Sequence, residues 1–308
     1  MASILTNNAA IAALQTLRSI ADSMATTQNR VAGGARVSSA ADNAAYWAIA
    51  TTMKSDVSAL GAVSDALGMG AAKVDTAYAG MEASIKIVEK IKAKVVASKE
   101  QGVDKAKVQE EIAQLQEQLK SIGVGSAFNG ENFLVGEAAE KTVVSGFVRD
   151  ANGNVMVKST TYEMTVEDSI LFAVDDDGEA TEDSGILTTT SETFTVDGED
   201  YAQVSVLAID VNEDGVDLDA VLLSVEWALD KMTVAGSKLG SLSARIDLQG
   251  DFAKKLTDAL TKGVGRLVDA DMNEESTKLK ALQTQQQLAI QALSIANSDS
   301  QNILSLFR

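Results

Sequence analysis

The chain contains no histidine, no cysteine and no proline among its 308 residues. These absences exclude a Ser-His-Asp triad, a cysteine nucleophile and any zinc site built from His or Cys ligands. They also exclude disulfides, so the composition alone does not place the protein in a reducing or an oxidising compartment. Cation sites built from carboxylates, and acid/base catalysis by carboxylates or lysine, are not excluded by these absences. We nevertheless expect no enzyme, no cofactor and no metal centre.

Long apolar runs are also lacking, and acidic residues outnumber basic ones. The segment 281–298 has no charge, but it contains five glutamines and therefore predicts a polar helix and not a membrane span. Polar side chains also interrupt the first 17 residues, which argues against a secretory signal. The 44 acidic and 26 basic residues give a net charge of −18, so we expect no nucleic-acid and no membrane partner.

The negative charge is concentrated in one segment. Residues 137–216 carry 19 acids and only three bases, whereas the rest of the chain is close to neutral. The sequence predicts a mainly α fold, in which long N- and C-terminal helices form a coiled-coil-like bundle, with a small β-rich insert domain. The insert has strand-like segments at 142–149 and 155–162 on either side of an Asn-Gly turn signal. Further strands are expected at 193–196 and 201–209.

Apolar residues recur at helical spacing in both flanks. Helices are expected from about Ala10 to the Gly33-Gly34 break, over 42–98, over 105–122 with Asp104 as the cap, from Asp217 or Asp219 to about Lys262, and from about Glu274. The first stripe runs through Ala10, Leu14, Leu17, Ala21, Met24, Gln28 and Val31. Narrow heptad seams need partners because isolated helices gain little from propensity alone. The two ends either pair with each other or also contact other chains.

Four motifs resemble those of bacterial flagellins, in the same order along the chain. They are residues 30–45 (RVAGGARVSSAADNAA), 128–130 (FNG), 268–272 (VDADM) and 301–308 (QNILSLFR). The first is similar to the family's leucine-serine-serine-glycine-leucine-arginine segment and the serine-alanine-lysine-aspartate-aspartate-alanine-alanine segment after it. The resemblance covers about residues 1–135 and 217–308.

The resemblance implies a structural subunit that polymerises into the helical flagellar filament for swimming motility. It implies inner-core terminal helices (1–42 and 264–308), outer-core helices (43–136 and 217–263) and a surface insert (137–216). It also implies type III export, an extracellular location, and four partners: further copies of the chain, a filament cap, hook-junction proteins and an export chaperone. We expect the terminal helices to fold on assembly, since a lone helix has little to bury. The expected assembly seam is Leu14, Leu17, Met24, Val31, Leu279, Leu282, Leu293, Ile303 and Leu306.

The chain departs from the family pattern at several positions. Tyr46-Trp47 stands where many flagellins have small or polar residues, and 298–300 replaces a common proline-containing turn. In the segment bound by the animal innate flagellin receptor, Lys90 stands for an arginine and Lys94 for a leucine, while Glu111 matches. Because a charge enters an apolar contact, these positions predict weaker receptor recognition. The other interpretation is that the two lysines form an ordinary solvated helix face.

Two other functions remain open from sequence alone. A hook–filament junction adaptor would share similar terminal helices. An acidic calcium-dependent binding module is indicated by residues 210–215, which resemble the opening of a calcium loop, but Val221 stands where the bidentate carboxylate is needed. A solvated turn before a helix cap explains the same residues. The run 175–178 predicts an exposed acidic turn, and Trp47 and Trp227 are interpreted as packing residues.

Overall fold

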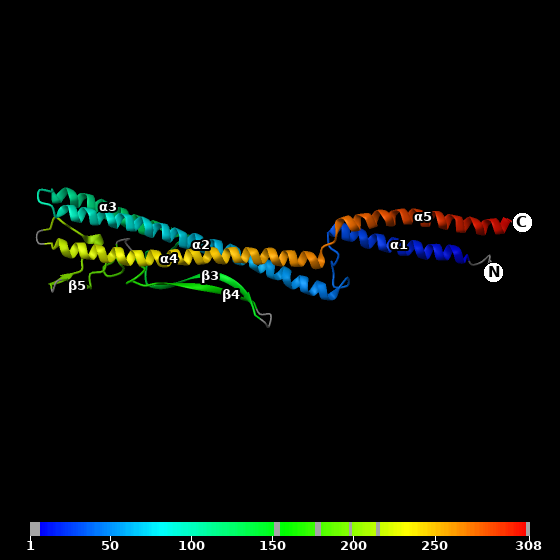
Figure 1. The fold of residues 1–308 in the computed structure, drawn as a ribbon, viewed down its shortest axis with the longest axis horizontal. Coiled ribbons are helices and arrows are strands. Elements are labelled where there is room, and N and C mark those ends of the chain that lie inside the picture. The colour runs from blue at the N-terminus through cyan, green and yellow to red at the C-terminus, as the bar shows by residue number, and fades with distance from the viewer. Residues whose placement is uncertain (1–6, 151–154, 176–179, 197–198, 214–215, 306–308) are drawn as a thin grey trace. The chain divides into compact units, whose positions relative to one another are not determined.

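The structure is a computed structural model that describes residues 7–150, 155–175, 180–196, 199–213 and 216–305. Five α-helices account for most of these residues: α1 (Asn8–Gly33), α2 (Ala44–Ser98), α3 (Lys105–Gly125), α4 (Leu218–Val268) and α5 (Met272–Ser305) (Figure 1). Within the described ranges, no helix is both long enough and apolar enough to cross a membrane. The mainly α fold with long terminal helices is confirmed.

The helix ends follow from local sequence. The Asn7 side chain accepts a hydrogen bond from the Ala10 N–H at 3.0 Å and begins α1, and Gly34, at a φ of 66°, ends it. Asp217 begins α4 by accepting from the Asp219 N–H at 2.9 Å. Asp104 precedes α3, but its side chain makes no capping bond. The expected cap is therefore wrong in its chemistry, although its position is right. α4 continues to Val268, beyond the expected end near Lys262.

The chain forms two compact units, of which the first comprises residues 1–58 and 257–308 and the second residues 59–256. In the second unit α2 buries a residue at every third or fourth position, as a heptad pattern requires. The buried α2 residues include Leu60, Val63, Leu67, Val74, Met81, Val88, Ile91 and Val95. On α4 the buried side chains include Val221, Val225, Met232 and Leu239. Figure 1 shows α2 and α4 side by side along this unit, with α3 next to them.

Where the structure describes it, the insert contains two-stranded hairpins and irregular chain, not one continuous sheet. β3 (Ala139–Arg149) pairs with antiparallel β4 (Val155–Met164), and β5 (Thr193–Val196) pairs with β6 (Glu199–Ala202). The expected strand over 201–209 is wrong beyond Ala202, because Val206–Ala208 forms a 3-10 turn. This turn buries Val206 and Ile209, whose carbonyl oxygens accept hydrogen bonds from the Gln116 amide. The Asn152-Gly153 turn signal lies outside the described residues.

A third, very short hairpin joins β1 (Ala127–Phe128) to β2 (Glu131–Asn132). Its two turn residues, Asn129 and Gly130, have φ values of 51° and 80°. Asn and Gly tolerate such positive φ values best, so this motif is a two-residue hairpin turn. The turn leads directly to Phe133 and Leu134, which are fully buried in the core of the second unit.

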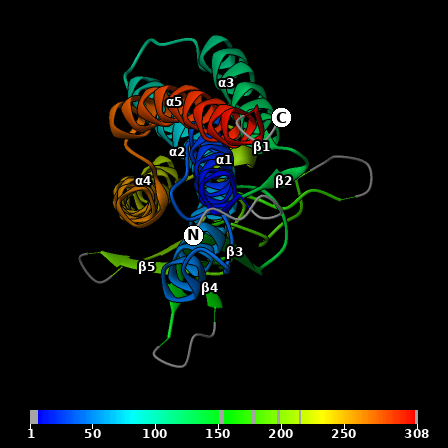
Figure 2. The same cartoon turned by 90° about the vertical axis from the view of Figure 1, so that its right-hand side faces the viewer.

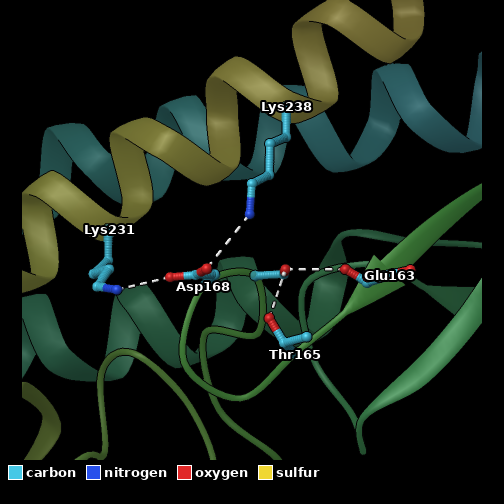
Figure 3. Close-up of polar contacts among 6 residues, drawn as sticks. Glu163, Thr165, Asp168, Lys231 and Lys238 are labelled. Carbon is cyan, nitrogen blue, oxygen red and sulfur yellow. Dashed lines mark hydrogen bonds and ion pairs between the residues drawn. The ribbon is translucent and has the colours of Figure 1, made fainter.

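A loop of the insert is fixed to α4 by one carboxylate. Asp168 accepts from the Lys231 ammonium at 2.7 Å and lies 3.6 Å from that of Lys238, as Figure 3 shows. The hydrogen bond from Lys231 holds the pKa of Asp168 below its usual value. The Lys231 ammonium also lies 5.6 Å from the ring centre of Trp227. Trp227 is half-buried and makes a cation–π contact with this lysine, whereas Trp47 is 40% exposed.

The β3–β4 hairpin packs on α2 through a glycine. A Cβ on Gly70 would lie 2.3 Å from the Cγ1 atom of Val143, a distance that no real contact adopts. Gly68, two residues earlier on the same helix, has open space at the corresponding position. Gly70 thus permits the close approach of the hairpin to α2.

Candidate functional site

The two terminal helices form an antiparallel pair in the first unit. α1 and α5 lie side by side in both views (Figures 1 and 2). At one end the Asn7 amide donates to the Ala296 carbonyl at 2.8 Å, and at the other the Arg30 guanidinium lies 3.2 Å from the Glu275 carboxylate. These two contacts fix the register of helices that are far apart in the sequence.

The seam between these helices follows a heptad pattern with alternating steps of three and four. On α1 the inward positions are Ala10, Ala13, Leu17, Ile20, Met24, Thr27 and Val31, and on α5 they are Leu279, Leu282, Gln286, Ala289, Leu293 and Ala296. Two positions of the expected stripe are wrong, since Leu14 is 40% exposed and Gln28 is exposed, and the residues before them face inward instead. At the third position Ala21 and Ile20 are both partly buried. Alanine is frequent at both the inward positions of α1 and the positions beside them, so hydrophobicity alone does not show which positions face the partner helix.

Of the expected assembly residues, Leu17, Met24, Val31, Leu279, Leu282 and Leu293 lie in this intrachain seam. Leu14 lies outside it. The Ile303 side chain and Leu306 fall outside the described residues. Whether these side chains also contact other subunits stays a prediction.

Pairing leaves much apolar surface on both terminal helices uncovered. On α1, Ile11 is 56% exposed, and on α5, Leu288, Ile290 and Ile295 are 58%, 54% and 67% exposed. The last three lie within the uncharged segment 281–298. Exposed apolar surface without nearby charge is typical of an interaction surface. Each helix therefore has one face for its partner in the chain and another that is free for contact.

Among the described residues of α1 and α5, the seam contains one ion pair, and its other inward positions carry no charge. Glu275 is 7% exposed; its Oε1 atom is the one near Arg30, while Oε2 is buried and has no partner among the described residues. A buried carboxylate is costly unless it is paired, so the position of Arg30 opposite Glu275 favours this register over a shifted one. Sequence reasoning missed the pair because the local heptad pattern does not show which residues meet across the seam.

The α1–α2 loop is hydrogen-bonded to the α4–α5 junction. The N–H groups of Arg36 and Val37 donate to the Val268 carbonyl at 2.6 and 3.2 Å, and the Ala270 N–H donates to the Gly34 carbonyl at 3.0 Å. Next to these hydrogen bonds, a small buried cluster is formed by Val37, Ala50, Val264 and Val268. The first and third flagellin-like motifs therefore meet, although more than 200 residues separate them.

Asp42 gives the same loop its shape. Its Oδ2 atom accepts from the N–H groups of Ser38 and Ser39, at 3.0 and 2.9 Å, and from both hydroxyls, at 3.1 Å each. The N–H of Ser39, then that of Ser38 and the two hydroxyls, hold the pKa of Asp42 below its usual value. The next residue, Asn43, accepts from the Tyr46 N–H at 3.1 Å and begins α2. Tyr46 and Trp47 then project into solvent, at 42% and 40% exposure.

The three residues expected to affect receptor recognition lie on α2 and α3. Lys94 and Glu111 form an ion pair between these helices, and the Lys90 side chain is exposed. The Glu111 carboxylate, which matches the family pattern, is therefore already engaged by Lys94 within the chain. The structure brings two of the three residues together.

The calcium-loop hypothesis has little structural support. The Asp210 carboxylate accepts from the Asn212 N–H at 2.8 Å, and Val221 is fully buried on α4. Asp214 and Gly215 lie outside the described residues, as does most of the acidic run 175–178. In the part of the chain that the structure describes, no three potential metal-ligating side chains cluster.

Comparison with known proteins identifies matches at both ends and over the full length. The bacterial flagellin N-terminal helical region matches residues 4–139, and the flagellin C-terminal helical region matches residues 222–307. Flagellin A of Rhizobium meliloti strain 1021 is 48% identical over 401 aligned positions, and Flagellin C of that strain is 47% identical over 322. A flagellin of Brucella melitensis biotype 1 is 42% identical over 309 positions. In all three cases the alignment covers 100% of both chains.

Proposed function

The chain belongs to the bacterial flagellin family, and from this premise we propose that its paired terminal helices drive the assembly of the filament. As a flagellin it is a structural subunit that polymerises into the flagellar filament for swimming motility, and it acts outside the cell. What the proposal adds is the mechanism of assembly, the subunit surface involved and the other proteins that handle the chain.

The observation that carries this mechanism is the apolar surface left on α1 and α5 after they have paired. Full burial of a large aliphatic side chain contributes about 1.5–3 kcal/mol, so Ile11, Leu288, Ile290 and Ile295 leave a substantial stabilisation unused in the single chain. Ordering the backbone of the two helices costs on the order of 1–2 kcal/mol per residue. We propose that contact with other subunits offsets this cost, and that the terminal helices complete their folding on assembly.

The absence of charge from 281–298 supports the same surface. A charge buried between subunits without a partner would be expensive, whereas glutamines can hydrogen-bond across a homotypic contact. We place residues 1–42 and 264–308 in the inner core of the filament and residues 43–136 and 217–263 in the outer core. The acidic insert, 137–216, faces solvent, where its charge keeps the surface hydrated.

We also propose that this chain has no catalytic role and requires no cofactor. Its partners besides its own copies are a filament cap, hook-junction proteins and an export chaperone, and it is exported through the type III apparatus. The lack of cysteine and proline is compatible with that route, since an unfolded chain then forms no cross-links and undergoes no slow prolyl isomerisation.

Two alternatives from sequence remain less well supported. A hook–filament junction adaptor would require the full chain to remain soluble and folded to its ends without polymerising. A calcium-dependent module would release heat on calcium titration and melt at a higher temperature with bound calcium.

The test compares the purified full chain with a truncation that lacks residues 1–45 and 264–308, both seeded with short filament fragments. Electron microscopy is expected to show long helical filaments only for the full chain. Equal assembly by the truncated chain would place the polymer contacts elsewhere and overturn the mechanism. Circular dichroism before and after assembly measures whether helix content rises as the ends become ordered.

A further inference from the structure

The β3–β4 hairpin has one face that is covered at its base and uncovered at its tip. Tyr162 and Met164 of β4 are 6% and 3% exposed, and Tyr162 lines a cavity with Leu242 and Arg245 of α4. Alternate residues of a strand share a face, so Lys158 and Met156 continue this face toward the tip. Met156 is 56% exposed, and Val148, directly opposite it on β3, is 40% exposed. Among the described residues, the part of this face toward the tip therefore exposes the apolar side chains of Met156 and Val148 together with Lys158.

This tip also differs in charge from the rest of the insert. Of the three basic residues of 137–216, Arg149 and Lys158 lie toward the tip of the hairpin, and Lys141 lies near its base, opposite Tyr162. Residues 165–216 contain 15 acids and no base. A partly apolar face that includes Lys158 is thus complementary in charge to the remainder of the insert.

An acid-rimmed cavity of about 340 Å³ lies at the other end of α4. Its lining includes the apolar side chains Val204, Ala208 and Val221, and its carboxylates are those of Asp200, Asp210, Glu213 and Asp217. Asp210 and Asp217 each accept a local backbone hydrogen bond through Oδ1, from Asn212 and Asp219 respectively, which fixes these carboxylates in place. Such a cavity suits a side chain or hairpin edge that combines an apolar body with a positive charge.

The tip and the cavity are too far apart to meet within one chain. Gly146 of β3 lies over Gln249 of α4, where a Cβ would be 3.6 Å from the Gln249 Oε1 atom, whereas the cavity is lined by Asp217 and Ala220. At a rise of 1.5 Å per residue, the intervening part of α4 spans about 45 Å. Figure 1 shows β3 and β4 running along α4 in the direction away from β5. Complementary surfaces at opposite ends of one body make a head-to-tail contact, which builds an open filament unless its rotation closes a ring.

We propose that the hairpin tip of one subunit, with Met156 and Lys158 on its inner face, docks into the acid-rimmed cavity at the start of α4 of the next subunit. The inference rests on the proposed polymer, because a second copy is the partner that a filament places at every subunit. Its contact joins the second unit of neighbouring copies and is separate from the contacts of the terminal helices.

The lack of native cysteine allows a direct test in assembled filaments. The full chain carrying Met156→Cys and Ala208→Cys is polymerised, oxidised and run on a non-reducing gel. We expect a ladder of cross-linked oligomers, because a disulfide forms only where Cα atoms lie within about 7 Å. The control pairs Met156→Cys with Ala113→Cys, an exposed position on α3 outside the cavity, and is expected to remain monomeric.

Charge reversal provides a second test that does not depend on cysteine. Lys158→Glu and Glu213→Lys are each expected to raise the concentration needed for assembly about two- to fivefold at low salt, and the double variant to restore it. Glu182→Lys, outside the cavity, should not rescue Lys158→Glu. Filaments without either the cross-link or the rescue would overturn this contact and leave the proposed function intact. A wild-type chain that forms no filaments would instead refute the proposed function, and this contact with it.

Discussion

Removing Arg30 should weaken the terminal helix pair far more than removing both members of its ion pair. The Glu275 side chain is 10% exposed and that of Arg30 is 28% exposed, so the pair is partly desolvated. Breaking a buried pair costs about 3–5 kcal/mol, because one charge is left without a partner. Since solvent still reaches Arg30, we expect a smaller loss for Arg30→Ala, about 1–3 kcal/mol. In Arg30→Met with Glu275→Leu, no charge remains buried and the loss should be small.

The assay is the concentration of soluble subunit that coexists with filaments. If the terminal helices fold on assembly, the loss appears directly in this concentration, and each 1.4 kcal/mol raises it about tenfold. Arg30→Ala should therefore raise it roughly five- to 150-fold, and the apolar double variant less than about fivefold. Equal effects from both variants would show that the loss comes from packing and not from the unpaired Glu275 carboxylate. No effect from Arg30→Ala would refute the role given to the pair.

Three further predictions concern the second unit. Gly70→Ala should lower the free energy of unfolding by about 1–3 kcal/mol in chemical denaturation, because its Cβ would meet Val143. Gly68→Ala, in open space, should raise it by about 0.5–1 kcal/mol. Equal effects of the two substitutions would contradict the packing described for the hairpin. The Asp168 pKa is lowered in the folded state, so its stabilising contribution, below about 1 kcal/mol for an exposed pair, is present above about pH 4 and lost as the pH falls through the folded-state pKa. The protection factors of the amides in 165–169, which compare exchange with the intrinsic rate at the same pH, should fall at that pH, and Asp168→Asn should show the lower protection at neutral pH too. Lys94→Leu should restore an apolar contact and strengthen signalling by the animal flagellin receptor in a reporter cell, with Lys86→Leu as the exposed control; unchanged signalling would favour a plain solvated face.

The heptad spacing was a reliable guide to the helices but not to their inward faces. Side chains such as Val74, Met81 and Val88 are large and regularly spaced, so the buried face of α2 follows from the sequence. In α1 the inward positions Leu17, Met24 and Val31 were predicted, but two of the positions between them, Leu14 and Gln28, were placed one residue late. Because alanines occupy neighbouring positions around α1, the position of the partner helix α5 determines which of them are buried, and that position depends on tertiary structure.

Contacts between distant segments were the least predictable features of the site. Arg30 and Glu275 are 245 residues apart, and no local pattern indicates that they meet. The 3-10 turn at Val206–Ala208 likewise depends on a distant residue, because Gln116 of α3 donates to the Val206 carbonyl. The Val and Leu residues of this segment favour a strand, but the contact with α3 holds it in a turn. The motif around Asp42, by contrast, was visible in the sequence, although the hydrogen bonds that Ser38 and Ser39 donate to this carboxylate were not.

The backbone bonds between the α1–α2 loop and the α4–α5 junction have a mechanical consequence. A torque on the paired terminal helices is transmitted through two backbone segments, the α1–α2 loop and the α4–α5 junction. The hydrogen bonds of Arg36 and Val37 to Val268, and of Ala270 to Gly34, join these two segments. Two backbone segments that are joined by hydrogen bonds at one junction resist twisting relative to each other there better than two unconnected segments do. For a subunit of a rotating propeller, this junction is a stiff coupling: twisting the terminal helices turns α2 and α4 together at that point, with little angular lag between them.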